Sequence, residues 1–282
     1  DIYNRADDFW ENNRLEVLNK DEKGVYKMLD TLKTVKKFKR LYNLGSILAS
    51  GYIEIPSINA DYGPIFSTFG FNEVEGLRLR AGGRTYFGPN DLWRVEGFLA
   101  YGFRDDKFKY GISGKWLLDK KSRLTIFGGN RRDVEQMGAS LTSSTDVLGR
   151  SLASSAVIVT GANNRLTNVN LTNFGMSFEP LRNFEVRLDG SFRKLSSASP
   201  SFSLDYNDIT SPTGVSSELS QFESRLSLGY YPKRQMTGFG VERKNKNDNF
   251  ARLFAQLSRG DRNWFTSDFD YTKMQLSYIQ PW

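Results

Sequence analysis

The sequence predicts an all-β fold, a transmembrane antiparallel up-and-down β-barrel that follows an N-terminal amphipathic helix. Three observations predict it. From about Gly45 to the end of the chain, apolar and polar residues alternate with a period of two. Aromatic residues make up 14% of the chain and gather on one parity of the best-defined strands. The connections alternate between tight turns and long polar loops, as they do in outer-membrane barrels.

The composition excludes several kinds of chemistry. The chain has no cysteine, so it has no disulfide, thiolate nucleophile or thiolate zinc site. It has no histidine, which is the commonest general base and metal ligand. No apolar run approaches the ~18–20 residues of a membrane helix. The net charge of +7 suits a nucleic-acid or anionic-surface partner, or scattered solvated lysines.

Residues 1–43 form a predicted periplasmic helical segment. Asn19 or Asp21 can cap one helix of about twenty residues, whose apolar side chains recur at three- and four-residue steps. They are Val25, Met28, Leu29, Leu32, Val35, Phe38 and Leu41. The other face is cationic, with Lys33, Lys36, Lys37, Lys39 and Arg40. That face suits phosphate headgroups or nucleic acid, or else it is the solvated side of a helix docked on the main domain.

Residues 44–282 form the predicted outer-membrane barrel, with about eleven strands. The predicted strands are 46–55, 74–87, 92–104, 106–118, 122–132, 168–180, 183–194, 222–231, 237–244, 250–259 and 265–280. A β-bulge near Thr272 would reconcile the two parities of the last strand. An odd number departs from the even count of single-chain bacterial barrels. A missing strand, an overcounted one or closure beyond this chain would each explain it.

The lengths of the connections predict which end of the barrel faces out. The sequences "GPND" (88–91), "DKK" (119–121), "PLRN" (180–183) and "YPKRQ" (231–235) are tight turns. The stretches 133–165 and 195–220 are long, polar and rich in serine, threonine and glycine. Long loops lie outside in outer-membrane barrels and short turns lie in the periplasm.

Aromatic side chains mark the two predicted membrane interfaces. Trp93 and Trp116 fall beside inner turns, and Tyr101, Phe103, Phe108 and Tyr110 crowd an outer turn. Trp93 and Tyr101 lie about 26 Å apart along a strand, or roughly 20 Å in height at a ~40° tilt. This height is close to the ~25 Å apolar band of such barrels. These six side chains are therefore the predicted lipid-interface aromatics.

The opposite parity carries the charges, which predicts a charged barrel lumen. The lumen-facing residues are Arg78, Arg80, Arg84, Arg94, Glu96, Lys109, Lys115, Arg187, Asp189, Asp268 and Asp270. Charges of both signs can pair across neighbouring strands. Because much of the positive charge then lies inside the barrel, nucleic acid is not an expected partner. A large soluble β-sandwich or jelly roll is the rival architecture.

The stretches "EGLRLRAGGRTY", "WRVEGFLAYGFRDDKFKYGISGKW" and "DFDYTKMQLSY" resemble an outer-membrane β-barrel family of Bacteroidota whose function is unknown. The resemblance covers the chain from about Asp8 and is most specific over 64–118. It implies a carboxypeptidase-like regulatory domain and a signal peptide ahead of the barrel, and further strands after Trp282. The family has no established catalytic residues, so the resemblance transfers no site to this chain.

Two acidic groups were weighed as metal or proton-transfer sites. Asp268 and Asp270 would be neighbours on one face of a strand, where they could share a proton, hold a metal or pair with lumen arginines. The cluster in "LDYNDIT" (204–210) could hold calcium, but an Asx-rich turn explains it as well. We predict no catalytic residue, no metal site and no cofactor.

Three functions fit the sequence. The first is a non-catalytic integral outer-membrane subunit or scaffold of a cell-envelope complex for protein assembly, export or uptake. It would contact lipid, and also other envelope proteins through its outer loops and N-terminal helix. The second is a stand-alone porin-like channel that favours anionic solutes. The third, an outer-membrane enzyme, is disfavoured by the missing histidine.

Overall fold

The computed structural model describes residues 19–88, 90–136, 165–199, 202–207, 212–263, 265 and 267–281. The chain divides into two compact units, residues 1–51 and 52–282. The division falls eight residues after the predicted domain boundary, because helix continues to Ser50. No helix in the described part of the chain is both long enough and apolar enough to cross a membrane.

In the described residues of the N-terminal unit, 19–51, two helices stand where the sequence predicted one. Helix α2 spans Lys20–Thr34 and begins in a capping box, in which the side chains of Asn19 and Glu22 each accept from the other's backbone N–H. Helix α3 spans Lys36–Ser50. Between them Val35 is extended (φ −72°, ψ 116°), and the Thr34 hydroxyl donates to the carbonyl of Thr31. The helical pattern breaks at Val35, and α3 begins after it without a side-chain cap.

The predicted first strand, 46–55, is wrong over most of its length. Residues up to Ser50 belong to α3, and only Ile53–Ile55 form a strand, β1. Helix α3 ends at Gly51, which adopts the left-handed conformation (φ 74°) and donates its N–H to the carbonyl of Ile47. The sequence shows only a short apolar run here, which fits a helix end as well as a strand.

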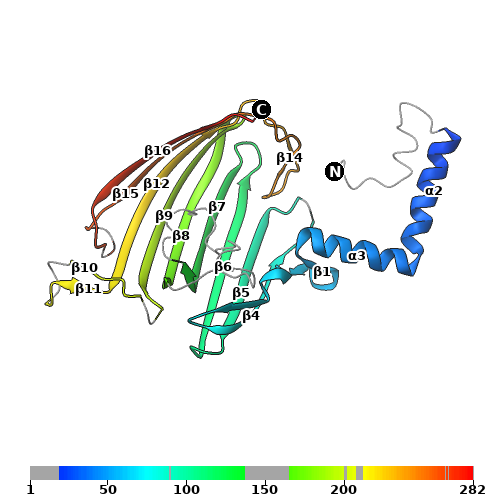
Figure 1. Cartoon of the computed structure of the whole chain (residues 1–282). Helices are drawn as coiled ribbons and strands as arrows, with labels where there is room; N and C mark the ends of the chain where they lie inside the picture. Colours follow the sequence, from blue (N-terminus) through cyan, green and yellow to red (C-terminus); the bar gives the residue numbers. More distant parts are fainter. Residues whose placement is uncertain are drawn as a thin grey trace. The chain divides into compact units, whose positions relative to one another are not determined.

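The second unit is an antiparallel meander, which confirms the predicted all-β class. Its strands are β1 (Ile53–Ile55), β2 (Ala60–Tyr62), β3 (Phe69–Asn72), β4 (Gly76–Thr85), β5 (Trp93–Gly102), β6 (Lys107–Asp119), β7 (Leu124–Gln136), β8 (Leu166–Leu181), β9 (Phe184–Ser197), β12 (Glu218–Tyr230), β15 (Arg252–Gly260) and β16 (Tyr271–Ile279). Among the described residues they form one twelve-stranded sheet, ordered β1-β2-β4-β5-β6-β7-β8-β9-β12-β15-β16, with β3 also on β4 (Figure 1). The sheet is open: β1 and β16 are its edges, and no closed barrel forms among the described strands.

The sheet is strongly curved, and one of its ion pairs shows the direction of the curve. Arg78 on β4 contacts Asp133 on β7 at 2.6 Å, although β5 and β6 lie between them. Three strand spacings amount to about 14 Å on a flat sheet, which is more than the two side chains together can span. The face that carries Arg78 and Asp133 therefore lies inside the curve. Figure 1 shows the bending of the strands.

Several predicted elements differ in the structure. The stretch 237–244 does not join the sheet: a long connection from Tyr231 to Ala251 holds only the small hairpin β13 (Met236–Thr237) and β14 (Lys244–Asn245). The last strand begins at Tyr271 rather than at 265, and β15 and β16 pair without a register shift, so no bulge forms at Thr272.

The strands that flank the two predicted long loops extend further into them than expected. Strand β7 runs to Gln136 and β9 runs to Ser197, and residues 137–164 lie outside the described part. Between β9 and β12 a short hairpin pairs β10 (Tyr206–Asn207) with β11 (Val215–Ser216).

Candidate functional site: the two faces of the sheet

Each long strand presents one apolar and one polar face. The apolar face is clearest in one row of side chains that face each other from β5 to β16: Trp93, Trp116, Ile126, Met176, Leu188, Leu226, Leu257 and Met274. Each of these side chains is exposed, from 36% for Leu226 to 70% for Met274. The row is continuous over eight neighbouring strands, so it is a property of the sheet and not of one strand.

The predicted interface aromatics all lie on this apolar face. Trp93 stands directly opposite Trp116, and Tyr101 stands directly opposite Phe108. The ring of Tyr101 lies 5.3 Å from that of Phe103 and 4.9 Å from that of Phe108. Five of the six are exposed, and Tyr101 is partly buried. The structure thus collects them at the two ends of β5 and β6.

The polar face buries a chain of ion pairs at the end of the strands away from the tight turns. Arg78 contacts Glu75 at 3.1 Å and Asp133 at 2.6 Å. Lys109 contacts Glu75 at 2.9 Å and Asp105 at 2.6 Å. Glu75 is fully buried and Arg78 is 2% exposed. Because charges removed from water are costly unless they are paired, this network must stay complete.

Glycine makes room for this network on β5. A Cβ atom at Gly102 would lie 2.8 Å from Nζ of Lys109 and 2.9 Å from Cβ of Glu75. No side chain fits between the paired groups. Gly102 is therefore required by the ion pair beside it.

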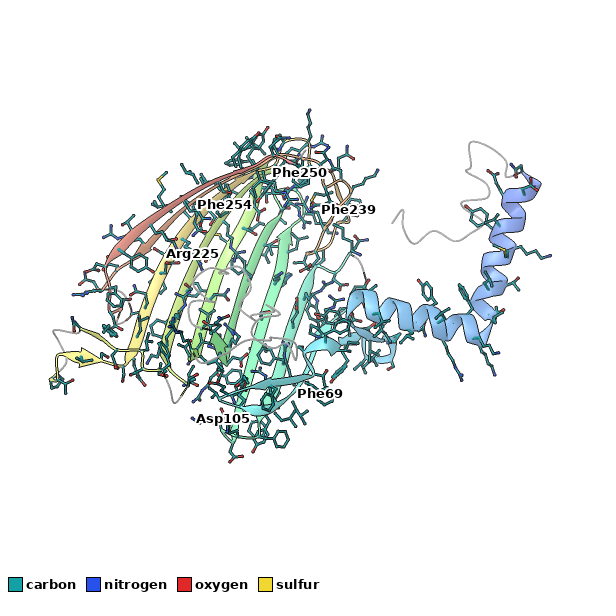
Figure 2. The ribbon with its side chains drawn as sticks, viewed as in Figure 1. Phe69, Asp105, Arg225, Phe239, Phe250 and Phe254 are labelled. Atoms are coloured by element: carbon teal, nitrogen blue, oxygen red, sulfur yellow. The ribbon has the colours of Figure 1, made fainter. Side chains whose placement is uncertain are left out.

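A second set of ion pairs lies further along the same face, on strands β7 to β12. Arg131 contacts Glu135 at 2.5 Å, and Arg225 contacts Asp189 at 2.7 Å. Asp189 also accepts from Arg187 at 3.0 Å. Figure 2 shows Arg225 about midway along its strand, with Asp105 near one end of the sheet and Phe239 and Phe250 near the other.

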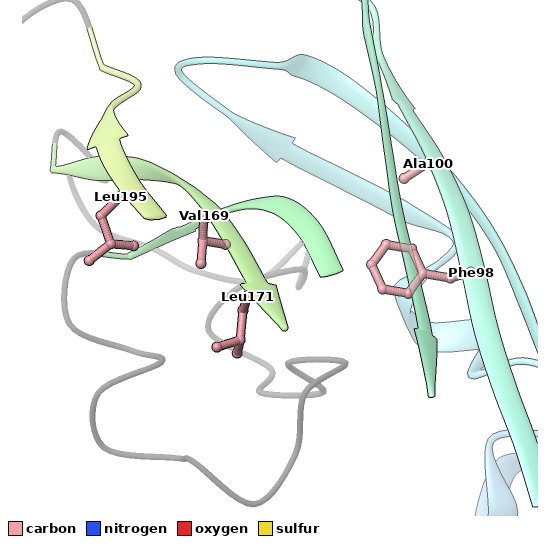
Figure 3. Close-up of a cluster of buried hydrophobic side chains, with 5 residues drawn as sticks. All are labelled: Phe98, Ala100, Val169, Leu171 and Leu195. Atoms are coloured by element: carbon pink, nitrogen blue, oxygen red, sulfur yellow. The ribbon is translucent and has the colours of Figure 1, made fainter. Parts of the chain in front are cut away.

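Apolar side chains also occur on the polar face, which the sequence analysis did not expect. Phe98 and Ala100 of β5 cluster with Val169, Leu171 and Leu195 of β8 and β9, and all five are buried (Figure 3). The Arg80 guanidinium lies 4.1 Å from the centre of the Phe98 ring, a cation–π contact. Phe98 and Leu99 are adjacent apolar residues, and this break in the alternation could have predicted an apolar side chain on the polar face.

The connection from Tyr231 to Ala251 crosses the polar face at the tight-turn end. The Arg123 guanidinium donates to the carbonyl oxygens of Phe239 (3.2 Å) and Gly240 (2.7 Å). The N–H of Phe239 donates to Oδ1 of Asn90, and Glu242 contacts Lys115 at 3.1 Å. The sequence predicted a tight turn and a strand here. The structure instead shows a connection between β12 and β15 that contacts the turns flanking β5 and β6.

Positive charges repel one another at this crossing. Burial, and then the nearby positive charge of Arg243, lower the pKa of Arg123 below its usual value, and Glu179 opposes this shift. Glu179 accepts from Arg234 at 3.3 Å and also contacts Arg243. Two guanidinium groups thus share this carboxylate, and Arg123 donates to backbone carbonyl oxygens instead.

The predicted lumen charges are mostly on the polar face. Arg78, Arg80, Arg94, Glu96, Lys109 and Asp189 are buried there, while Arg84, Lys115 and Arg187 are partly buried. Arg84 contacts Asp61 of β2 at 2.9 Å, and Arg94 contacts Asp91 at 3.5 Å.

Asp268 and Asp270 do not form the predicted pair. They lie before β16 and not on a strand, so the two-residue spacing does not place them side by side. Asp268 accepts from the backbone N–H of Ser220 at 2.5 Å, and the exposed Asp270 accepts from that of Arg262 at 2.6 Å. The first carboxylate holds the segment before β16 against strand β12, and the second closes the turn at Arg262. Of the predicted calcium cluster, 208–210 lie outside the described residues.

The sequence analysis missed the acidic partners of the buried network. Glu75, Asp133 and Glu135 are among its most deeply buried charges, yet none was predicted. Arg131, Asp133 and Glu135 alternate in "NRRDVEQ", so the signal was present in the two-residue period. In the described part of the chain, no group of three or more acidic side chains is arranged to hold a metal ion.

No family model matches this chain, and the searches of curated proteins and of solved structures found no similar protein.

Proposed function

We propose that residues 52–282 are a wall of an outer-membrane β-barrel, and that the protein is a non-catalytic subunit or scaffold of a cell-envelope complex. The resemblance to the Bacteroidota family is part of this proposal, as are the barrel and the bacterial outer membrane. In this arrangement the apolar face touches lipid and the polar face lines the interior.

The observation that carries the membrane proposal is the contrast between the two faces of the same strands. Arg78 and Glu75 are at most 2% exposed, whereas Trp116 is 54% exposed and Phe108 is 65% exposed. Proteins that fold in water rarely leave an apolar surface of this extent uncovered. Lipid acyl chains would remove the unfavourable contact between this face and water, and they need no second protein layer.

The subunit role is supported by how the polar face is filled. Paired charges, the Phe98 cluster and the connection from Tyr231 to Ala251 occupy that face. Helix α3 offers a surface for partners, since Leu41 (68% exposed), Leu44 (54%) and Leu48 (58%) recur at three- and four-residue steps and none of its residues is buried.

Quenching of tryptophan fluorescence by brominated lipids tests the membrane proposal. A variant that keeps Trp116 and has phenylalanine at the other four tryptophans is reconstituted in vesicles with bromine on the acyl chains. We expect strong quenching, because Trp116 would touch those chains. The matched control is Phe98→Trp in a tryptophan-free chain, which places the probe on the polar face and should be quenched little. Equal quenching of the two variants, or a protein that stays dispersed without detergent, contradicts the proposal.

Gentle purification tests the scaffold role. The tagged protein is extracted in mild detergent and its co-purifying envelope proteins are quantified. We expect the double variant Leu44→Glu and Leu48→Glu to lose specific partners, and the exposed control Lys36→Glu to retain them. The same partner set for all three proteins would contradict a role for α3.

The porin-like alternative remains testable because the polar face is rich in arginine. A planar bilayer containing the purified protein would then show steady conductance with anion selectivity. The filled polar face leads us to expect little conductance, and a large steady current would favour the channel over the scaffold.

A further inference from the structure

A cavity of about 440 Å³ lies on the polar face, between β6 to β9 and the connection from Tyr231 to Ala251. Its walls combine small polar and apolar side chains, among them Thr125, Ser177, Phe127 and Phe178. Five cationic side chains line it: Lys115, Arg123, Arg187, Arg234 and Arg243. Two carboxylates, those of Glu179 and Glu185, line it as well. The lining therefore carries three more positive than negative charges (five minus two).

Three of the four carboxylates at the cavity are each shared between two cations. Glu179 serves both Arg234 and Arg243. Asp189, just outside the lining, serves Arg187 of the lining and also Arg225. Glu242 in turn serves Lys115 and Arg94. When Asp189 and Glu242 are counted with the lining, one positive charge remains in excess (five minus four).

Among the described residues, Arg123 is the lining cation that contacts no carboxylate. Its two terminal nitrogens donate to backbone carbonyl oxygens, and its Nε atom is buried without an acceptor. Nε of Arg234, whose side chain is 10% exposed, is also buried without an acceptor. A buried charged donor that lacks an acceptor is costly, and both donors belong to residues that line one cavity.

We propose that this cavity binds a small multivalent oxyanion, such as a molecule with a diphosphate or polycarboxylate group. Guanidinium groups bind phosphate and carboxylate oxygens through paired, charge-assisted hydrogen bonds. An oxyanion would give Arg123 its missing counter-charge and screen it from Arg243. The apolar walls could accommodate an uncharged part of the ligand, since the Arg187 guanidinium already lies over the Phe127 ring, 4.0 Å from its centre.

This binding site goes beyond the scaffold role and does not depend on it. Its residues belong to β6–β9, the tight turns and one connection, and binding can be measured on the whole chain in detergent.

Titration calorimetry with inorganic pyrophosphate tests the site. The whole chain is kept in a non-ionic detergent at pH 7, and sodium chloride matches the ionic strength of every injection. We expect saturable binding at one site. Lys115→Gln removes a cation that is 39% exposed and should weaken binding about tenfold. Lys120→Gln removes the same charge from an exposed turn outside the lining and should change affinity less than about twofold.

A carboxylate introduced into the lining by mutation gives a second, independent test. Ser177→Glu places a negative charge among the lining residues, so it should raise the Tm and abolish the further rise that pyrophosphate causes in the parent protein. If that variant fails to fold, Arg243→Gln replaces it and should weaken binding about tenfold. The proposal is overturned if the parent chain shows no saturable binding, if Lys115→Gln and Lys120→Gln weaken it equally, or if Ser177→Glu binds like the parent.

Discussion

The two faces of strands β4 to β16 differ in which side chains they bury: one buries charged side chains, and the other exposes apolar ones. On the polar face, Arg78 and Glu75 are buried and must find partners within the protein. On the apolar face, Leu99 and Trp116 are exposed, and the described part of the chain leaves them uncovered. A strand in water places its apolar residues in the core, and here the order is reversed. The comparison teaches that one two-residue period can gather polarity inside the curve of the sheet and leave an apolar face exposed outside it, which is the contrast on which the membrane proposal rests.

The largest expected effect is on the buried network of the polar face. Arg78→Met leaves Asp133 and Glu75 without their central cation, and we expect it to destabilise the fold by about 3–5 kcal/mol. The measurement is urea unfolding in phospholipid vesicles, followed by tryptophan fluorescence. Arg259→Met is the control, because Arg259 is 68% exposed beside Asp261 and should cost no more than about 1 kcal/mol. Equal effects of the two changes would mean that water solvates the charges of the polar face.

The next effect discriminates between lipid and water on the apolar face. Leu99 lies in the middle of β5 and is 53% exposed. At the centre of a bilayer, Leu99→Arg should cost about 2–4 kcal/mol. In water the same exposed position would tolerate arginine within about 0.5 kcal/mol. The same urea titration measures the difference, and a neutral outcome in vesicles contradicts the membrane proposal.

A change at the end of a strand tests whether the cost of a charge on the apolar face depends on its depth in the membrane. Leu181 is 70% exposed and is the last residue of β8, next to a tight turn. Because the turn would lie at the interface, Leu181→Arg should cost only about 0–1 kcal/mol. The ratio of the effects at Leu99 and Leu181 measures the depth of the apolar band. A ratio near one would show that depth does not matter on this face.

The smallest effect lies at the rim of the polar face. Lys115 and Glu242 are 39% and 43% exposed, so Glu242→Gln should destabilise the fold by about 0.5 kcal/mol. Screening should remove this difference at about 1 M salt, where the Debye length is only ~3 Å. Unfolding at low and high salt gives the comparison. A large effect that persists in salt would place this pair inside a dry interior.

The sequence predicted the regular part of the sheet well. Period-two alternation located β5, β6 and β9 closely and put Trp93, Phe108 and Trp116 on one face, because strand geometry fixes the direction of alternate side chains. The cap at Asn19 was also readable, since its chemistry is local. The predictions failed at 46–55, 237–244 and 265–280, where short apolar runs fit several structures and distant contacts decide between them.

What the sequence by itself determined is the antiparallel all-β class and the division of each strand into an apolar and a polar face, because both follow from a local period. The tertiary structure alone decided the open edges of the described sheet, the pairing of Arg78 with Asp133 across two strands, and the path of 231–251 over the tight-turn end. These features depend on the curvature of the sheet, which brings together residues that are far apart in sequence and that no local pattern connects.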